Sequence, residues 1–280
     1  MAFSGQTFAT WGRGMTASES LQNRYRKRDN RRKELCRQIT DHDGFKDSRA
    51  ARWGGFIADA AVKRCDDEFL FRHPVESFAG HIKHAIDAMN SRPSEMIRVG
   101  CFKPRISKQG YELPMYVLET CMADQPFIVD TIKLVLRSME VRVLGTMHMI
   151  LPVERDAEGL VTDISTDGTE RNNESLTCHL LAVASVRGRV GDIRKAVARH
   201  LEQAAVVVRD FAAMRDACSR AAANLLEAAE SVDGETMPLR EAAAFADWLM
   251  QDHFVCMGTY RIEQDGTVSE RLGLGAGPGT

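Results

Sequence analysis

The stretch from 115 to 136 constrains the fold most, because an apolar strand pattern runs directly into an amphipathic helix pattern. Residues 115–122 are rich in types that fit a pleated surface. Apolar residues then follow at helical spacing from 128 to 136, and Asp124 and Pro126 are typical of a helix start. We therefore predict a strand-to-helix junction with Asp124 as the N-cap. Free backbone N–H groups at such a junction can hold a small carboxylate.

Strand patterns continue on both sides of this junction. Short strands are predicted at 97–102, 115–122 and 160–164, and long strands at 141–154 and 175–186, with a helix at 126–139. Strand, helix, strand, strand and helix follow one another in the order of a ferredoxin-like βαββαβ sheet. The strands at 141–154 and 175–186 are apolar at nearly every residue, which is expected when both faces of a sheet are covered.

Helix patterns flank the predicted sheet. Residues 49–66 and 74–89 carry apolar positions at helical spacing, and this period is sustained through much of 191–230. An unbroken helix there would be about 60 Å long, so we expect one break near 209–214. A further helix at 239–251 leads into a β-hairpin.

The predicted fold class is α+β, with a helical N-terminal segment, a ferredoxin-like domain, long helices and a C-terminal β-hairpin. The predicted parts are 1–92 for the helical segment, 93–190 for the ferredoxin-like domain, 191–236 for the long helical segment, and 237–280 for a helix plus hairpin that starts a next module. The polar residues 1–20 and 165–174 are predicted to be a loose start and a flexible loop.

Composition excludes several classes of protein. With 280 residues, of which 44% are hydrophobic, the chain can bury a substantial core. It has neither an apolar run long enough to span a membrane nor a signal-peptide core in residues 1–20, so we expect a cytoplasmic protein without a membrane partner. Its seven widely spaced cysteines fit reduced, buried thiols better than a disulfide frame or a zinc site.

The stretch from 24 to 37 is strongly basic and is open to two interpretations. It is either a nucleic-acid contact or a solvated helix face. Asp29 and Glu34 dilute its charge, and the formal net charge of the chain is −2, so we favour the helix face and expect no nucleic-acid partner.

Four histidines are candidates for chemistry. His81 and His84 are spaced i and i+3, which can place two metal ligands on one helix face, but no third ligand is evident nearby in the sequence. His148 and His179 fall on predicted neighbouring strands, where a satisfied structural pair is favoured over an acid–base pair. The glycine-rich residues 273–279 do not open a helix, as a dinucleotide loop must. We predict no catalytic, cofactor-binding or metal-binding residues.

Two groups of motifs carry a resemblance. The first is Gln-Pro-Phe-Ile-Val-Asp at 125–130, then a strand with His148, then Arg155 to Gly159 as Arg-Asp-Ala-Glu-Gly. The second is the Trp-Leu-containing segment 246–254, then Met257-Gly258, then Leu-Gly-Leu-Gly at 272–275. Over about residues 90–275 the chain resembles the first ACT-type domain region of the large bacterial NAD-dependent glutamate dehydrogenases. It departs from their pattern at Met149, where the family has proline after the histidine.

The resemblance implies that 93–190 is an ACT-like domain in the N-terminal regulatory and oligomerisation region of such an enzyme. The full enzyme would convert L-glutamate to 2-oxoglutarate and ammonia with NAD, by chemistry in a downstream catalytic domain, so this chain would be non-catalytic and hold no cofactor. ACT-type domains bind amino acids at the strand-to-helix junction, which makes Asp124, Gln125 and Phe127 the candidate effector contacts.

Partners are expected from the same enzyme. The sheet edges and the two apolar strands predict self-association as a homo-oligomer, or docking on the rest of the chain. The alternative is a stand-alone ACT-type amino-acid-sensing or scaffold protein. It is excluded if the reading frame continues past Thr280 into a Rossmann-type region.

Overall fold

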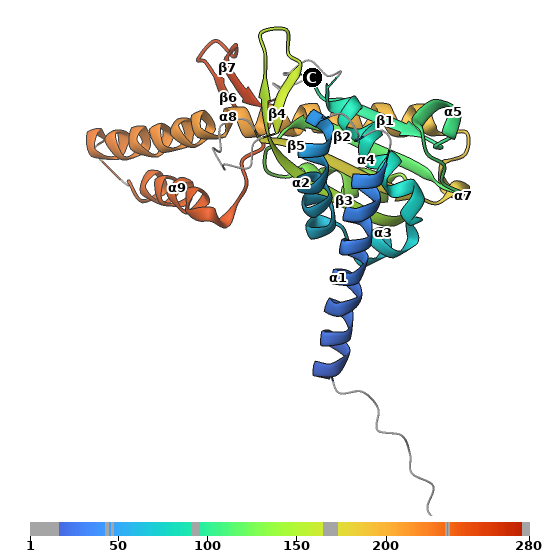
Figure 1. Cartoon of the computed structure of the whole chain (residues 1–280). Coiled ribbons are helices and arrows are strands. Elements are labelled where there is room, and N and C mark those ends of the chain that lie inside the picture. The colour runs from blue at the N-terminus through green and yellow to red at the C-terminus, as the bar shows by residue number, and fades with distance from the viewer. Residues whose placement is uncertain are drawn as a thin grey trace, which may run out of the picture.

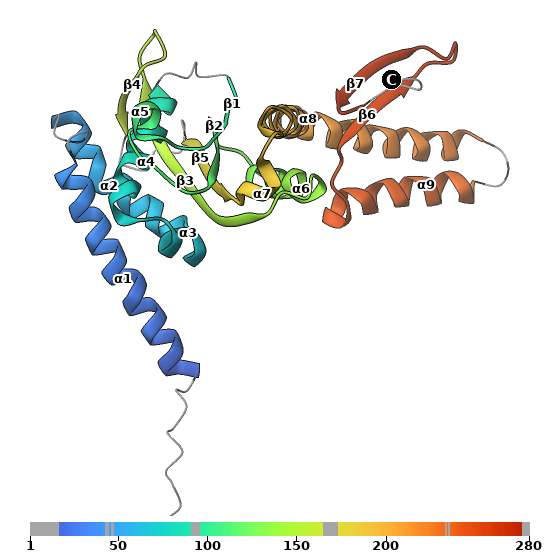
Figure 2. The ribbon, with the colours of Figure 1, turned by 90° about the vertical axis from the view of Figure 1, so that its right-hand side faces the viewer.

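The computed structural model describes residues 17–42, 45, 48–90, 96–164, 173–232, 234 and 236–275. Four N-terminal helices pack on one side of an antiparallel sheet, and a long helix on its other side carries a separate hairpin (Figures 1 and 2). The predicted α+β fold class is therefore confirmed. No helix in these ranges is both long and apolar enough to cross a bilayer.

The N-terminal helices are α1 (Ala17–Asp41), α2 (Ser48–Arg64), α3 (Asp67–Arg72) and α4 (Val75–Asn90). Helix α1 already begins at Ala17, inside the predicted loose start, and residues 1–16 lie outside the described residues. Helix α3 was not predicted. It begins because Asp66 accepts a hydrogen bond from the backbone N–H of Phe69 at 2.6 Å, and the same carboxylate accepts one from Thr146 at 2.8 Å. Asp66 thus joins α3 to the sheet.

The basic side of α1 contacts the ends of α2 and α3. Arg28 donates to the carbonyls of Val62 and Cys65 at 3.0 and 2.9 Å, near the C-terminus of α2. Arg31 donates to the carbonyl of His73 at 2.6 Å, just after α3. Cations at helix C-termini satisfy carbonyls that have no partner within the helix. These arginines therefore hold the N-terminal helices together.

The sheet contains β1 (Arg98–Phe102), β2 (Tyr116–Ala123), β3 (Val143–Arg155), β4 (Val161–Ile164) and β5 (Asn173–Leu181). Its order is β1-β2-β5-β3-β4, with every neighbouring pair antiparallel. The strands β2, β3 and β5 take the places of the first three strands of a βαββαβ unit. The place of its last strand, beside β2, is occupied by β1, which precedes the unit in the chain and follows α4. A one-turn helix, α5 (Ile106–Gln109), lies between β1 and β2.

Two predicted boundaries are wrong at β5. The strand was expected to continue to residue 186, but it ends at Leu181 and the short helix α7 (Val183–Val186) follows. The flexible loop was expected to reach residue 174, but Asn173 and Glu174 pair with Pro152 and Leu151 of β3. Residues 165–172 of that loop lie outside the described residues.

Both faces of the sheet are buried, as the apolar strands predicted. One face of β2, β3 and β5 packs with α2, α3 and α4 into a core that runs from Leu35 to Leu180. Helices α6 (Ile128–Ser138) and α8 (Val190–Ser231) form a second core on the other face, best seen in Figure 2. The helices that cover both faces belong to this chain.

Helix α8 is continuous over 42 residues, so the break predicted near 209–214 is wrong. No proline occurs in it, and its only glycine is Gly191, in the first turn. The segment that was expected to break instead holds the end of the hairpin: Asp210 accepts a hydrogen bond from the backbone N–H of Gly273 at 2.9 Å, and buried Met214 lies against the same glycine. Both residues need a regular helix to face Gly273 together.

The chain after α8 forms a helix and a hairpin, as predicted. Helix α9 (Met237–Trp248) returns along α8 and ends in a single π-helical turn at Leu249–His253. Strands β6 (Gly258–Ile262) and β7 (Val268–Gly273) form the hairpin. Because residues i and i+5 lie close in a π turn, His253 stacks on Trp248 with ring centroids 4.5 Å apart.

Candidate effector site at the strand-to-helix junction

The junction between β2 and α6 differs from the predicted helix start. Helix α6 begins at Ile128, and its N-cap is Phe127, which has φ 71° and makes no side-chain capping bond. The prediction that Asp124 is the N-cap is therefore wrong. Phe127 has a left-handed backbone, which is not helical, so α6 can begin only after it. The first helical residue is therefore four positions after Asp124. Its first intrahelical bond runs from the N–H of Thr131 to the carbonyl of Phe127. The backbone N–H groups of Ile128 to Asp130 precede that bond.

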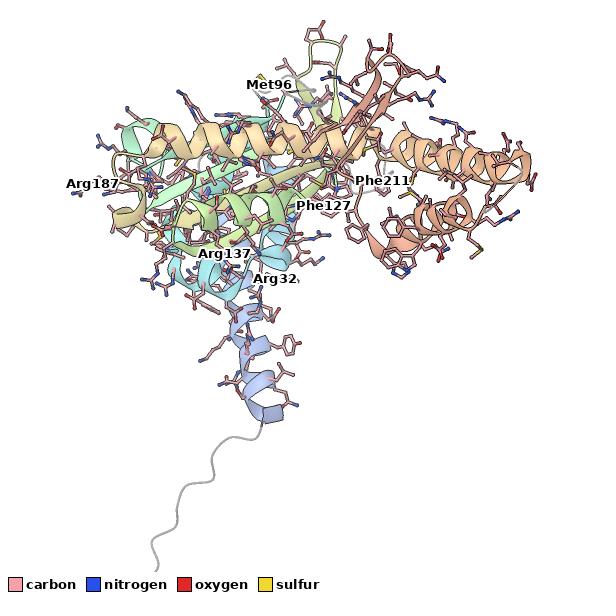
Figure 3. All side chains as sticks on the ribbon, turned by 180° about the vertical axis from the view of Figure 1, so that it is seen from behind. Arg32, Met96, Phe127, Arg137, Arg187 and Phe211 are labelled. Carbon is pink, nitrogen blue, oxygen red and sulfur yellow. The ribbon has the colours of Figure 1, made fainter. Side chains whose placement is uncertain are left out.

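The three predicted effector contacts surround this helix start. The backbone N–H of Asp124 donates to the carbonyl of Asn173 at 2.8 Å, which fixes the loop to β5. Gln125 is half-buried, and its side-chain nitrogen has no hydrogen-bond partner within the described residues. The side chain of Phe127 is 49% exposed. It lies at the N-terminal end of α6, whereas Arg137 lies at the C-terminal end (Figure 3).

Beneath α6 the sheet carries a layer of polar side chains. Only the two histidines of this layer were identified as candidates from the sequence. The layer comprises Thr120 of β2, Thr146 and His148 of β3, and Ser175, Thr177 and His179 of β5. The register places these residues on one face of three adjacent strands. The sequence does indicate this layer, because polar and apolar residues alternate along β5 from residue 175 onward. The polar positions are Ser175, Thr177 and His179.

Four residues of the polar layer form two hydrogen-bonded pairs. The hydroxyls of Thr120 and Thr177 lie 2.7 Å apart, and His148 Nε2 lies 2.8 Å from the Ser175 hydroxyl. Burial lowers the pKa of His148, and the charge of Arg64 acts in the same direction, whereas Asp124 opposes both. The carboxylate of Asp124 thus acts electrostatically on one residue of the polar layer.

His179 is fully buried, and both its ring nitrogens lack hydrogen-bond partners in the part of the chain that the structure describes. Burial, with smaller contributions from the charges of Lys133 and His148, lowers its pKa to about 3. The expected satisfied pair of His148 and His179 is thus wrong, because His148 bonds to Ser175 instead. A neutral His179 offers hydrogen bonds rather than charge.

Arg155, which opens the Arg-Asp-Ala-Glu-Gly motif, forms a buried two-point ion pair. Its guanidinium donates to both oxygens of Glu174 at 2.7 and 2.8 Å, and also to the carbonyls of Gly159 and Met89 at 2.5 and 3.1 Å. These contacts connect β3, β5, the turn at Gly159 and the end of α4. The role of this motif residue is therefore structural.

On the opposite face of the sheet, the fold supplies two potential ligands that the spacing of His81 and His84 did not reveal. Glu119 of β2 and Cys178 of β5 are paired in register, and both lie next to His81 of α4. All seven cysteines are free thiols, and Cys178 is among the buried ones.

Comparisons with known proteins agree with this architecture. The family model for the ACT1 domain of glutamate dehydrogenase matches residues 57–201. An NAD-specific glutamate dehydrogenase of Halomonas elongata is 28% identical over 177 residues, which is 61% of this chain and 11% of that protein. The protein of the same name from Pseudomonas aeruginosa is 25% identical over 163 residues, 57% of this chain and 10% of that protein. The chain thus spans about a tenth of the length of these curated relatives. Since the family model covers more than half of it, the chain belongs to the glutamate dehydrogenase ACT1 domain family.

Proposed function

We propose that this chain is the N-terminal regulatory and assembly region of a large, cytoplasmic, NAD-dependent glutamate dehydrogenase. The full enzyme would deaminate L-glutamate oxidatively to 2-oxoglutarate and ammonia, with NAD bound outside this region. The region itself is non-catalytic. Membership of the ACT1 family and the names of the two relatives support the proposal.

Regulation is proposed to act through an amino acid bound at the junction. The observation that carries this is the start of α6, which has no side-chain cap and lies beside the unpartnered side-chain nitrogen of Gln125. The N–H groups before Thr131 would receive the carboxylate, favoured by the helix dipole by about 0.3–1 kcal/mol. Asp124 would bind the ammonium group, and the exposed ring of Phe127 would cover the side chain. This arrangement selects a small zwitterion over a simple anion.

Titration of the ¹⁵N-labelled chain with glutamate, aspartate and other amino acids tests this site. We expect saturable shifts of the amides from Asp124 to Asp130, and their loss in Asp124→Asn, because the ammonium contact is removed. Glu158→Gln, in the exposed turn after β3, is the matched control and keeps the shifts. NAD is the control ligand. Flat shifts up to millimolar amino acid would contradict the effector site, and saturable NAD binding would contradict the non-catalytic assignment.

Assembly is proposed to use the apolar surface at the end of α9 and on the segment that follows it, up to Met257. Large apolar side chains are exposed there: Phe245, Trp248, Phe254, Val255 and Met257. Contiguous exposed apolar patches on soluble proteins mark interaction sites. Aromatic rings stack within this surface, with the centroids of Phe245 and Trp248 5.9 Å apart.

Sedimentation velocity at high micromolar concentration tests the assembly surface. We expect the chain to self-associate through it, and we expect Trp248→Ser with Phe254→Ser to sediment as a monomer because both changes remove exposed rings from the patch. Leu134→Ser is the control, since it removes an equally exposed leucine from α6, away from this surface. A strictly monomeric wild-type chain, or an equal effect of the control, would contradict the assignment.

A further inference from the structure

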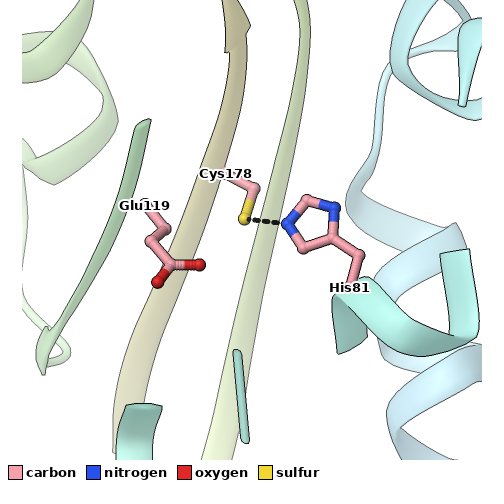
Figure 4. Close-up of side chains that lie close together, drawn as sticks. All are labelled: His81, Glu119 and Cys178. Atoms are coloured by element: carbon pink, nitrogen blue, oxygen red, sulfur yellow. Dashed lines mark hydrogen bonds between the residues drawn. The ribbon is translucent and has the colours of Figure 1, made fainter. Parts of the chain in front are cut away.

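His81, Glu119 and Cys178 come together in the core between α4 and the sheet (Figure 4). Each offers one ligand atom, and the three atoms lie within 4.8 Å of one another. All three residues are at least nine-tenths buried. They come from a helix and two adjacent strands, so the backbone fixes their positions.

A chain of hydrogen bonds sets the tautomer of His81. His73 Nδ1 lies 3.1 Å from the carbonyl of Pro74, which only accepts, so that nitrogen carries the proton of His73. In the neutral ring of His73 the other nitrogen, Nε2, carries no proton. It therefore accepts from His81 Nδ1 at 2.8 Å. The remaining nitrogen of His81, Nε2, then has a lone pair that accepts a hydrogen bond from the Cys178 thiol, 2.9 Å away. A hydrogen bond on the far nitrogen is the usual orientation device of metal-binding histidines.

Glu119 is a buried carboxylate without adequate compensation. Neither of its oxygens has a hydrogen-bond partner within the described residues. His84 Nε2 lies 3.2 Å from Oε1, at an ion-pair distance but without hydrogen-bond geometry. Gly100 on β1 makes room for this side chain, because a Cβ there would lie 3.2 Å from Glu119 Cγ. A buried charge requires a counter-charge or donors, and a bound cation would supply one.

A nucleophilic role for the Cys178–His81 pair does not fit. Cys178 is fully buried, so no substrate reaches its sulfur. Burial and the charge of Glu119 raise the pKa of the thiol well above its usual range, whereas reactive cysteines are partly exposed and have lowered pKa values.

We propose that His81 Nε2, Cys178 Sγ and a Glu119 oxygen bind one divalent transition metal, with zinc as the best fit. Imidazole, thiolate and carboxylate are the three ligand types of protein zinc sites. Binding replaces the Cys178 S–H proton with the metal and releases that proton to solvent, with no redox change. His84 supports Glu119 from outside, and the fourth position is taken by water. The metal would join α4 to β2 and β5, and so attach the N-terminal helices to the ACT sheet.

Cobalt and zinc titrations of the chelator-treated chain test the site. We expect one equivalent of Co²⁺ to produce a thiolate-to-cobalt charge-transfer band, which Zn²⁺ then removes. Cys178→Ser should lack the band, and the isosteric Glu119→Gln should bind more weakly. Changing His73 to glutamine should weaken binding about 10–100-fold, as for other outer partners of ligands. Cys101→Ser, a buried thiol on the other face of the sheet, is the matched control and should keep the band.

X-ray absorption of the zinc-loaded wild-type chain provides a readout that needs no variant. One sulfur at about 2.3 Å and nitrogen or oxygen neighbours at about 2.0–2.1 Å are expected. Absence of stoichiometric binding, a zinc shell without sulfur, or a cobalt band that survives Cys178→Ser in a folded variant would overturn the proposal. None of these readouts depends on the effector site or on the enzyme.

Discussion

Replacing Arg155 with methionine is expected to lower the free energy of unfolding by about 3–5 kcal/mol, the usual cost of breaking a buried ion pair. The side chains of Arg155 and Glu174 are only 10% and 8% exposed. Methionine fills much of the volume but leaves the Glu174 carboxylate buried without its guanidinium partner. The carbonyls of Gly159 and Met89 also lose their donor.

Urea denaturation of matched variants measures this effect. Arg137→Met, which removes an exposed arginine from the last turn of α6, should change the free energy of unfolding by less than about 1 kcal/mol. The double variant Arg155→Met with Glu174→Gln should be less destabilised than the sum of its single variants, because it removes the orphaned charge. A loss within about 1 kcal/mol of wild type for Arg155→Met would show that the pair is not structurally important.

Local patterns in the sequence were sufficient for most elements of this fold. The strands around the junction, the amphipathic helix after it and the C-terminal hairpin follow from periodicity and turn residues. The position of β1 beside β2 did not follow, because strand order depends on long-range packing of α4 and the sheet. The continuity of α8 was also missed, since the contacts of Asp210 and Met214 with Gly273 involve residues far apart in the chain.

The candidate sites show the same limit. Asp124, Gln125 and Phe127 do lie at the junction, and their role as effector contacts stays a prediction. The left-handed backbone of Phe127 was not foreseeable, because side chains other than glycine rarely adopt it. Glu119 and Cys178 meet only through the register of β2 and β5, and no spacing in the sequence shows that register.

Acidification from pH 7.5 to 5 is expected to destabilise the chain by about 4 kcal/mol through His73 and His179. Their pKa values are about 4 and about 3 in the folded state, against about 6.5 for an unfolded histidine. Both values are depressed, so the unfolded chain binds protons first as the pH falls. Their contribution to stability is complete above the unfolded pKa and is lost below it. At pH 5 the loss is about 2 kcal/mol for each residue, and burial of His81 acts in the same direction.

The acid effect is measured as the difference in unfolding free energy between pH 7.5 and 5, with chelator present so that metal binding at His81 does not contribute. His179→Leu should reduce this difference by about 2 kcal/mol, because leucine cannot be protonated. Thr177→Val is the matched control on the same strand and face. It breaks the hydrogen bond to Thr120 and should lower stability equally at both pH values. An unchanged pH dependence in His179→Leu would mean that the ring of His179 is reached by water and titrates normally in the folded chain.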